Sequence, residues 1–306
     1  MQTSSATKSG RAKEDGRIVP DRPDFAFDPT DPWTLTFQKG LEAAKLEGKT
    51  VYEVGVGTGI NVAFLLRMCG AKTVYGSDLD ARLPDLAEKN VKDLVAKEAE
   101  QFRPIKGSVS LIDSDQARAA VKDSDVVIAC LPQVGDPHDS RVTAFRNAQK
   151  APLAEGTGKG PAEDHVAHYY PWAMFDDYPY NSVGLGLNEA LLRQVRTEAP
   201  KAELIMNFGA RIGTDILFDF FKSNGYEPEK ISSMIVRQHA GTDISFFVAL
   251  ERALMGTGVE SEFACCFYSD EDGTQNLSAC EAQDLLTADA KTPIFHEVCT
   301  IHAKPV

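Results

Sequence analysis

The sequence of 306 residues lacks the features that mark membrane and secreted proteins. It contains no run of about eighteen apolar residues, so we expect no transmembrane helix. Residues 1–17 are rich in Ser, Thr, Lys and Arg without an apolar core, which is not the pattern of a secretory signal. Glu14 and Asp15 argue against a mitochondrial peptide. The sequence therefore predicts a cytoplasmic protein whose residues 1–24 form a disordered tail.

Basic charge is also scarce. Lys and Arg number 32 against 45 Asp and Glu, which gives a formal net charge of −13. Long-range attraction to nucleic acid or to anionic lipid is disfavoured at this charge, whereas a small or cationic ligand is easier to accommodate. We expect a small-molecule substrate, no nucleic-acid partner and no membrane partner. Oligomeric state is not readable from the sequence, and a homodimer remains open.

Metal-ligand spacing is missing as well. The six cysteines include no Cys-x-x-Cys pair, and their pattern favours small core residues in a reducing compartment over a metal site or disulfides. His165 and His168 stand three residues apart, but no third ligand lies close to them in the sequence. We expect no metal site.

A glycine-rich turn is the most informative feature that is present. Thr50–Val54 reads as a buried strand, and Gly55, Gly57 and Gly59 follow it in alternation. Glycines at such spacing let the backbone turn tightly and approach a ligand closely. Helix-forming residues continue over 61–68, and the N-terminus of that helix offers unpaired N–H groups.

An acid closes the next strand-like run. Asp78 ends that run about twenty residues after the turn, where a carboxylate can accept both hydroxyls of a ribose. A dinucleotide fingerprint would continue with glycine at the sixth position, where this sequence has Ile60. Glu53 stands two residues before the first glycine. The sequence predicts a nucleoside site that is not built for a pyrophosphate; the alternative is a glycine-rich turn that binds nothing.

The pattern Glu53-x-Gly-x-Gly-x-Gly, with Asp78 downstream, resembles motifs I and II of the class I S-adenosylmethionine-dependent methyltransferases. The resemblance implies S-adenosyl-L-methionine as cofactor and S-adenosyl-L-homocysteine as product. It places Glu53 near the cationic methionyl end of the cofactor and Asp78 on the ribose. Asp113 or Asp115 should meet the adenine amino group, with the Ser-Asp pattern favouring Asp115. Further cofactor-binding candidates are Gly55, Gly57, Thr58, Gly59, Leu79, Ser114, Cys130 and Leu131.

Strand-like and helix-like runs alternate along the chain and predict an α/β fold. The expected strands are Thr50–Val54, Lys72–Ser77, Gly107–Ile112, Asp125–Leu131, Ala202–Phe208, Ile231–Arg237 and Ile244–Glu251. The expected helices lie near 58–69, 84–100, 185–198 and 214–224. We expect a Rossmann-like, doubly wound class I methyltransferase sheet of seven strands. Its last strand would be antiparallel, as the resemblance implies.

The domain boundaries follow from this expectation. Residues 25–255 would form the methyltransferase domain, with a substrate-side insertion at 133–183 after the fourth strand. Residues 256–306 would form a small C-terminal extension packed on the same domain. This extension contains strand-like runs, Glu262–Tyr268 and Ile294–Ile301, and whether they extend the sheet is open.

The insertion carries an aromatic cluster interleaved with acids. Its aromatic residues are Tyr169, Tyr170, Trp172, Phe175, Tyr178 and Tyr180. Aromatic clusters more often pack than bind, but long insertions at the active edge of such a sheet often serve as lids or substrate pockets. An aromatic and acidic pocket would suit a cationic sulfonium product. We expect Tyr169 and Tyr170 to help position the substrate.

The segment Ala129-Cys-Leu-Pro-Gln133 ends the fourth expected strand. Many amino methyltransferases have Asn-Pro-Pro-Tyr or Asp-Pro-Pro-Tyr here, whose first side chain aims a nitrogen nucleophile at the methyl group. Leu131, or Cys130 in the other register, replaces that acceptor. This favours a carbon, oxygen or sulfur nucleophile.

Five segments in order resemble the methionine S-methyltransferases. They are Asp31–Leu41, Leu131–Gln133, Gly184–Leu187, Asn207–Gly213 and Thr242–Ser245 with its trailing Glu251. They span roughly 31–255, with departures from the family pattern at Ala210 and Ile212. The chain resembles the short, stand-alone bacterial type, which makes S-methylmethionine on a route to dimethylsulfoniopropionate. It lacks the long C-terminal region of the plant enzymes.

This resemblance implies methyl transfer to the thioether sulfur of L-methionine. A thioether sulfur carries no proton, so proximity and desolvation suffice and no residue acts as acid or base. We expect Arg211, with Asn207 beside it, to hold the α-carboxylate, and Asp243 to hold the α-ammonium. Trp33 and Thr34 would cover the cofactor. The alternatives are a methyltransferase acting on another O, N or C nucleophile, a nicotinamide-dependent oxidoreductase, which Ile60 disfavours, and a binding module without chemistry.

Overall fold

The computed structural model describes residues 13–14, 17–18, 31–133, 178–239, 244–256 and 265–306. Two short strands, β1 (Lys13–Glu14) and β2 (Arg17–Ile18), pair antiparallel near the N-terminus. Most of the expected tail and most of the 133–183 insertion lie outside the described residues.

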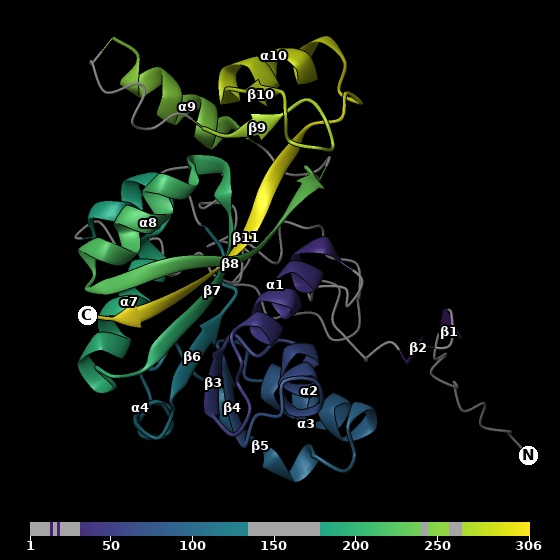
Figure 1. The fold of residues 1–306 in the computed structure, drawn as a ribbon, viewed down its shortest axis with the longest axis vertical. Helices are drawn as coiled ribbons and strands as arrows, with labels where there is room; N and C mark the ends of the chain where they lie inside the picture. Colours follow the sequence, from purple (N-terminus) through teal and green to yellow (C-terminus); the bar gives the residue numbers. More distant parts are fainter. Residues whose placement is uncertain (1–12, 15–16, 19–30, 134–177, 240–243, 257–264) are drawn as a thin grey trace, which may run out of the picture.

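A nine-stranded sheet forms the centre of the molecule, in the order β10-β9-β11-β7-β6-β3-β4-β5, with β8 paired to β11 (Figure 1). Its main strands are β3 (Thr50–Val54), β4 (Thr73–Asp78), β5 (Phe102–Ser108), β6 (Val126–Ala129), β7 (Glu203–Gly209), β8 (Tyr226–Arg237) and β11 (Phe295–Pro305). The strands β3 to β7 pair parallel, whereas β11 runs antiparallel to β7 and β8. This is the class I methyltransferase strand order, and the expected fold class is confirmed.

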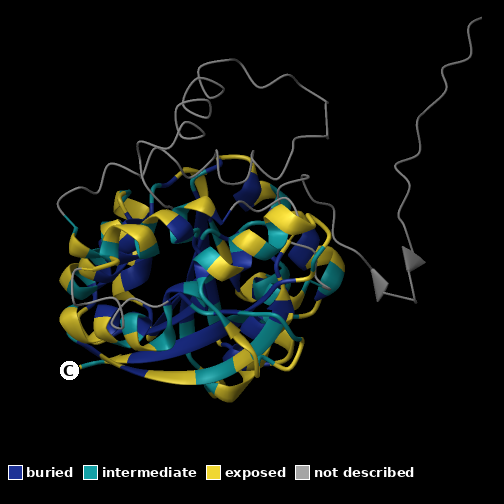
Figure 2. Cartoon of the chain, turned by 90° about the horizontal axis from the view of Figure 1, so that it is seen from above, coloured by how far each residue is buried: buried dark blue, intermediate teal, exposed yellow. Residues whose placement is uncertain are grey.

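Helices cover both faces of the sheet. The helices α1 (Pro32–Ala43), α2 (Ile60–Arg67) and α3 (Leu83–Leu94) pack on one face. The helices α4 (Asp115–Lys122), α7 (Gly186–Glu198) and α8 (Thr214–Ser223) pack on the other. Each face of the sheet forms an apolar core with its helices, and successive strand residues point to opposite faces. Val51 packs in the core beneath α1, α2 and α3, and Tyr52 in the core beneath α4, α7 and α8. Figure 2 shows the buried strands in dark blue within this helical cover.

Short 3₁₀ turns complete the body of the fold. They are η1 (Ala99–Gln101), η3 (Pro179–Val183) and η4 (Ala210–Ile212). The turn η4 follows β7 directly and carries Arg211. Its position at the carboxyl end of a central strand places it where ligands bind in sheets of this type.

A small unit at the start of β11 has its own apolar core, with buried Val248, Phe267, Ala282 and Ile294 among its members. We call this unit the C-terminal cap: α9 (Ser245–Leu254), β9 (Phe267–Tyr268), β10 (Asn276–Leu277) and α10 (Ala279–Ala288). It stands at the top of Figure 1, and β11 runs from it down into the sheet.

The expected strand at Ile244–Glu251 is wrong. These residues belong to helix α9, because a short apolar run fits a buried helix as well as a buried strand. The antiparallel last strand is instead β11, which lies within the segment expected to be a C-terminal extension. Residues 256–306 therefore supply a strand of the central sheet.

The third expected strand is misplaced. The strand β5 covers Phe102–Ser108, whereas the residues after Ser108 form a loop in which Leu111 has a left-handed φ of 51°. Pro104 lies inside β5 and Pro228 inside β8. Both strands are at edges of the sheet, where a residue without a backbone N–H is tolerated. The helices expected near 58–69, 185–198 and 214–224 are confirmed as α2, α7 and α8.

Within the described ranges, no helix is both long enough and apolar enough to span a bilayer.

Candidate functional site

The glycine-rich turn joins β3 to α2 at the carboxyl edge of the sheet. Gly55, Gly57 and Gly59 have φ values of 76°, 53° and 78°, in the left-handed region that favours glycine. A Cβ on Gly59 would also lie 3.0 Å from Ala87 of α3. The turn can therefore keep this course only with glycine at these positions.

Neighbouring strands and helices hold the turn in place. Gly55 N and Val56 N donate to Ser77 O of β4 at 3.0 and 2.9 Å. Asn90 of α3, which is buried, donates through Nδ2 to Thr58 O at 3.0 Å. The sequence analysis missed Asn90, although a lone Asn between the apolar positions Ala87 and Val91 is a recognisable signal. The turn is fixed before any ligand arrives.

Asp78 faces the turn from the end of β4. Its carboxylate is buried and accepts from Gly57 N and Asp80 N, each at 3.0 Å. Burial raises the pKa of Asp78 to about 6, against the opposing effect of these backbone bonds. A carboxylate has about four lone-pair sites, so further acceptor capacity remains for hydroxyl groups.

Glu53 lies one strand away, also buried. Its Oε1 accepts from Asn61 Nδ2 at 3.0 Å. Glu53 Oε2 and Asn61 Oδ1 are both buried and lack a hydrogen-bond partner. Burial, aided by the charge of Asp78, raises the pKa of Glu53 to about 8. Two unpaired buried acceptors are costly, and they fit a ligand that brings N–H donors, such as an ammonium group.

Two predicted cofactor residues act in local capping. Ser114 is the N-cap of α4, with its side chain accepting from Ala117 N at 3.1 Å. Thr34 N donates to Asp31, the N-cap of α1, at 3.1 Å. Leu79 offers its carbonyl to Ser108 Oγ at 2.6 Å.

The adenine candidates are both exposed. Asp115 is the first residue of α4, and its side chain is 98% exposed and pairs with Arg118 at 2.5 Å. Asp113 lies in the loop before α4 and accepts from Ser110 N at 3.0 Å. Exposure does not separate the two candidates.

The ends of β6 and β7 are joined by a side chain. Gln133 Nε2 donates to Gly209 O at 3.0 Å, and Gly209 N donates to Gln133 Oε1 at 2.9 Å. Buried Asn188 of α7 donates to Pro132 O at 3.2 Å. Leu131, two residues before Gln133, is buried. Gln133 thus fixes the segment after β6 against the backbone after β7, a role the sequence analysis did not assign.

Asn207 fixes the position of α1. It is buried, its Nδ2 donates to Trp33 O at 3.2 Å, and its Oδ1 accepts from Thr300 Oγ1 at 3.0 Å. Cys130 Sγ lies 3.9 Å from the same Nδ2. Asn207 was expected beside Arg211 on the substrate carboxylate, which stays a prediction; in the structure its amide binds protein groups that place Trp33.

Arg211 lies at the centre of the other half of the site. Its Nε donates to Gln238 Oε1 at 3.0 Å and its Nη2 to His296 Nε2 at 2.9 Å. The guanidinium carbon lies 5.7 Å from the Trp33 ring. Burial lowers the pKa of Arg211 to about 10. No carboxylate of the described part of the chain forms an ion pair with it.

The absence of a side chain at Gly209 lets three other side chains approach its backbone closely. A Cβ there would lie 2.7 Å from Arg211 Nη1, 2.9 Å from Trp33 and 3.3 Å from Gln133 Oε1. These groups come from η4, α1 and the segment after β6. Gly209 is therefore the point at which these elements converge.

Gln238 and His296 were not predicted. His296 begins β11, and Gln238 directly follows β8. Because β11 is antiparallel, its start reaches the same edge as the ends of β7 and β8. Because the last strand was expected at Ile244–Glu251, the sequence did not indicate that these two residues lie near Arg211. The candidates Tyr169, Tyr170 and Asp243 lie outside the described residues.

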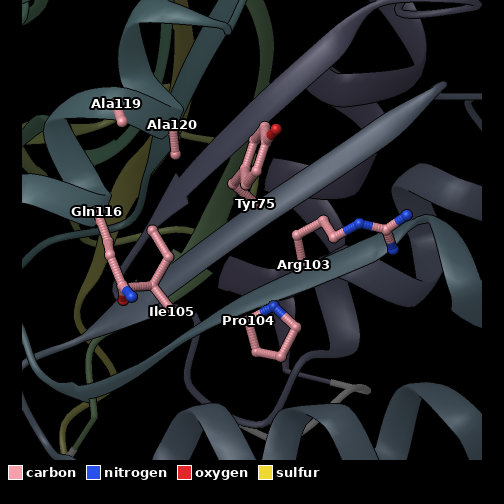
Figure 3. Close-up of a pocket in the computed structure, with 7 residues that line it drawn as sticks. All are labelled: Tyr75, Arg103, Pro104, Ile105, Gln116, Ala119 and Ala120. Atoms are coloured by element: carbon pink, nitrogen blue, oxygen red, sulfur yellow. The ribbon is translucent and has the colours of Figure 1, made fainter.

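A separate pocket lies between β4, β5 and α4 (Figure 3). It is lined by Tyr75, Arg103, Pro104, Ile105, Gln116, Ala119 and Ala120, with a volume of about 360 Å³. It includes none of the site residues named above. Among the described ranges, no group of His, Cys, Asp and Glu is arranged to hold a metal ion.

Comparison with known proteins supports the resemblance seen in the sequence. No family model matches the chain. The methionine S-methyltransferase of Zea mays is 24% identical over 240 residues, which cover 74% of this chain and 21% of the maize protein. That of Hordeum vulgare is 25% identical over 241 residues, with the same coverage of 74% and 21%. The chain thus matches about a fifth of the length of these relatives.

Among solved structures, the SAM-dependent methyltransferase from Geobacter sulfurreducens in complex with S-adenosyl-L-homocysteine aligns with a TM-score of 0.40 and 13% identity. The alignment covers 91% of this chain and 92% of that protein. The similarity is low, and the fold described above rests on the strand order itself. By sequence, the chain is a distant homologue of the methionine S-methyltransferases.

Proposed function

We propose that this protein transfers a methyl group from S-adenosyl-L-methionine to the thioether sulfur of L-methionine, giving S-methylmethionine. The observation that carries the proposal is a pair of subsites of opposite character at one edge of the sheet. Glu53 and Asn61 leave acceptors unpaired on the β3 side, and on the β7 side no carboxylate of the described ranges pairs with Arg211. The distant homology supports the same reaction.

The residues of the β3 side fit the cofactor. Glu53 Oε2 and Asn61 Oδ1 would accept from its ammonium group, and Asp78 would accept from its ribose hydroxyls. The bound cofactor supplies an electrophilic methyl group on a cationic sulfur. Nearby carboxylates favour that cation by Coulomb attraction.

The residues of the β7 side fit an amino acid acceptor. Arg211 would bind the α-carboxylate, because a guanidinium binds a carboxylate in a bidentate manner. Asp243 remains our candidate for the α-ammonium. The thioether sulfur has no proton to lose, so the chain needs no acid or base for this step.

The remaining contribution of the chain is to align the acceptor and to exclude water. Asn207 fixes Trp33, and Gln133 fixes the backbone at Gly209, so both groups around Arg211 are held before binding. Leu131, or Cys130 in the other register, stands at the position of the usual nitrogen-aiming side chain and brings no carboxylate or amide oxygen there. Two effects would accelerate methyl transfer: the acceptor sulfur loses its water next to the cationic sulfur of the cofactor, and the two sulfurs are held in a fixed geometry.

A second candidate is methyl transfer to an oxygen, nitrogen or carbon of another small molecule. The same cofactor side would serve it, and Arg211 would then bind another anion. A nicotinamide-dependent oxidoreductase is disfavoured, because α2 begins with Ile60 where the pyrophosphate fingerprint has glycine. We place the proposed reaction at the first step toward dimethylsulfoniopropionate.

Radiolabelled methyl transfer tests the proposal directly. Purified protein with labelled S-adenosylmethionine should label methionine, with S-methylmethionine as the product by chromatography, in preference to a panel of amines, phenols and carboxylic acids. Labelling of a panel member without labelling of methionine would replace the acceptor. Binding of NADH without binding of S-adenosylhomocysteine would overturn the cofactor assignment.

A further inference from the structure

The structure assigns to Gln238 and His296 a shared role: among the described residues, the Arg211 guanidinium is held through these two neutral acceptors alone, which keeps its positive charge available and selects an acceptor with a free carboxylate. This inference rests on the proposed function, because it specifies how the acceptor side of that site recognises its substrate. Neither residue needs to touch the reacting atoms, and we describe both as positioning residues.

Gln238 provides a neutral acceptor from the end of β8. Its side chain is 7% exposed, its Oε1 accepts from Arg211 Nε at 3.0 Å, and its backbone N donates to Ile294 O at 2.7 Å. The other half of its amide, Nε2, is buried without a hydrogen-bond partner. An unpaired buried donor beside a guanidinium is costly, and an anion that reached both groups would offset that cost.

His296 provides the second neutral acceptor, from the start of β11. It is 1% exposed, and Arg211 Nη2 donates to its Nε2 at 2.9 Å. A guanidinium has no lone pair to offer, so this bond requires Nε2 unprotonated and places the ring proton on Nδ1. Burial and the adjacent Arg211 charge hold the pKa of His296 well below its usual value. The ring is therefore neutral in the folded protein.

Two other charged groups that are withdrawn from solvent have partners of opposite charge, unlike Arg211 in the described part of the chain. Buried Glu189 is paired with Arg193 at 2.6 Å, and half-buried Glu203 with both Lys49 at 3.5 Å and His302 at 2.7 Å. Arg211, which is half-buried, is the one member of this set that contacts an amide and an imidazole and no carboxylate of the described residues. Withdrawing a cation from water without a counter-ion is costly, and a bound carboxylate would offset that cost.

The hydrogen bonds of Arg211 indicate which of its atoms would receive the carboxylate. Nε and Nη2 are each engaged once, and Nη1 has no hydrogen-bond partner among the described residues. We expect the carboxylate at Nη1, which packs closely against the backbone at Gly209. An acceptor with a neutral amide in place of the carboxylate would leave the cation uncompensated, so the site should discriminate strongly between the two.

The substitution Gln238→Glu tests the role of neutrality. It keeps the size of the side chain and its bond to Arg211 Nε but places a carboxylate against the guanidinium. We expect methionine binding to the S-adenosylhomocysteine complex to weaken about 30-fold or more, with the thermal midpoint unchanged or raised. A purely structural role for Gln238 would leave methionine binding intact in this variant, which would overturn the inference.

Gln194→Glu is the matched control for the added charge. Gln194 also accepts a hydrogen bond through Oε1, from Ile112 N at 3.4 Å, and lies on α7 away from Arg211. We expect methionine affinity within about threefold of wild type in this variant. An equal loss in both variants would show a general charge effect and would overturn the role of Gln238.

Substitutions at His296 test the second acceptor. His296→Leu removes it, whereas His296→Gln can restore an acceptor near the Nε2 position. We expect a rise of about tenfold or more in KM for methionine in His296→Leu, partial rescue in His296→Gln, and little change in kcat. His302→Leu, on the same strand but paired with Glu203, should leave KM unchanged. Equal kinetics for the Leu and Gln variants would contradict the role of His296.

Failure of the inference and failure of the proposed function give different results. Calorimetry on the S-adenosylhomocysteine complex would compare methionine with methioninamide, and acetate and 3-methylthiopropanoate with their amides. If methionine does not bind but the short carboxylates bind more tightly than their amides, with Gln238→Glu abolishing the difference, the acceptor is wrong and the subsite stands. If methionine and methioninamide bind equally, the subsite is wrong, whichever acceptor is methylated.

Discussion

The two halves of the ligand-binding edge are built in different ways and carry opposite charge. On the side of β3 and β4, the buried groups are Glu53 and Asp78, carboxyls whose pKa values are raised to about 8 and about 6. On the side of β7, β8 and β11, the charged group is the half-buried Arg211, whose pKa is lowered to about 10 by desolvation. The β3 half suits a cation, and the β7 half suits an anion.

The halves also differ in how their residues are distributed along the chain. The β3 half comes almost entirely from one stretch, 53–78, in which strand, turn, helix and strand follow one another. The β7 half combines the start of α1, the end of β6, η4, the end of β8 and the start of β11. A contiguous site can be recognised from local spacing, whereas an assembled site can be recognised only once the strand order is known.

The largest effect is expected from a substitution that impairs only the β7 half of the site. Arg211→Met should reduce kcat/KM for methionine about 100-fold or more, because it removes the cation that pairs with the carboxylate. Calorimetry should show S-adenosylhomocysteine binding within about threefold of wild type, because Glu53 and Asp78 are unchanged. Loss of both affinities together, in a folded protein, would mean that the two halves are not separate subsites.

The reverse change breaks the β3 half. Asp78→Asn keeps the shape of the side chain but removes an acceptor and a charge from the ribose side. We expect S-adenosylhomocysteine to bind about 10-fold to 100-fold more weakly, with methionine binding at saturating S-adenosylhomocysteine little changed. Unchanged cofactor affinity in this variant would place the ribose elsewhere.

A smaller effect is expected from displacing Arg211 and Trp33. Gly209→Ala would bring a methyl group within 2.7 Å of Arg211 Nη1 and 2.9 Å of Trp33, so that these side chains must shift. We expect KM for methionine to rise about tenfold while S-adenosylhomocysteine affinity is retained. A rise in cofactor Kd instead of methionine KM would assign these side chains to the cofactor side.

The smallest expected effect is a pH dependence of stability that comes from the Glu53 carboxyl in the β3 half. The pKa of Glu53 is raised from 4.5 to about 8, mainly by burial. Because the folded-state pKa lies above that of the unfolded chain, the carboxyl stabilises the free protein fully below pH 4.5, and this contribution is lost as pH rises through about 8. The thermal midpoint of the free wild type should therefore fall relative to that of Glu53→Gln over this window.

Cofactor binding should show the opposite trend. An ammonium group prefers ionised Glu53, so S-adenosylhomocysteine should bind wild type more tightly as pH rises toward about 8. In Glu53→Gln, binding should be weaker and its pH dependence flatter. Parallel pH profiles for the two proteins would show that Glu53 does not face the ammonium group.

Sequence reasoning was accurate where local pattern is sufficient. Gly55, Gly57 and Gly59 all have the left-handed φ that their alternation predicted, and Asp78 faces them. It was wrong for the last strand, because the run beginning at Ile244 is apolar enough for either a strand or a helix, and tertiary packing decides for α9. With that strand misplaced, nothing in the sequence could bring His296 beside Arg211.

The roles of two other residues could not be predicted from the sequence for a different reason. Asn207 and Gln133 were recognisable as polar residues at strand ends, but their partners, Trp33 O and the backbone of Gly209, are distant in sequence. A side chain that positions a neighbour resembles one that binds a ligand until its hydrogen bonds are known. Spacing identifies such residues, and only the folded arrangement distinguishes the two roles.

A crystal structure with S-adenosylhomocysteine and methionine tests the opposition of charge most directly. The account predicts the cofactor ammonium group within hydrogen-bond distance of Glu53 Oε2 and Asn61 Oδ1, with the methionine carboxylate on Arg211 beside Gly209. A cofactor carboxylate at Arg211, or a methionine carboxylate bound away from Arg211, would contradict it.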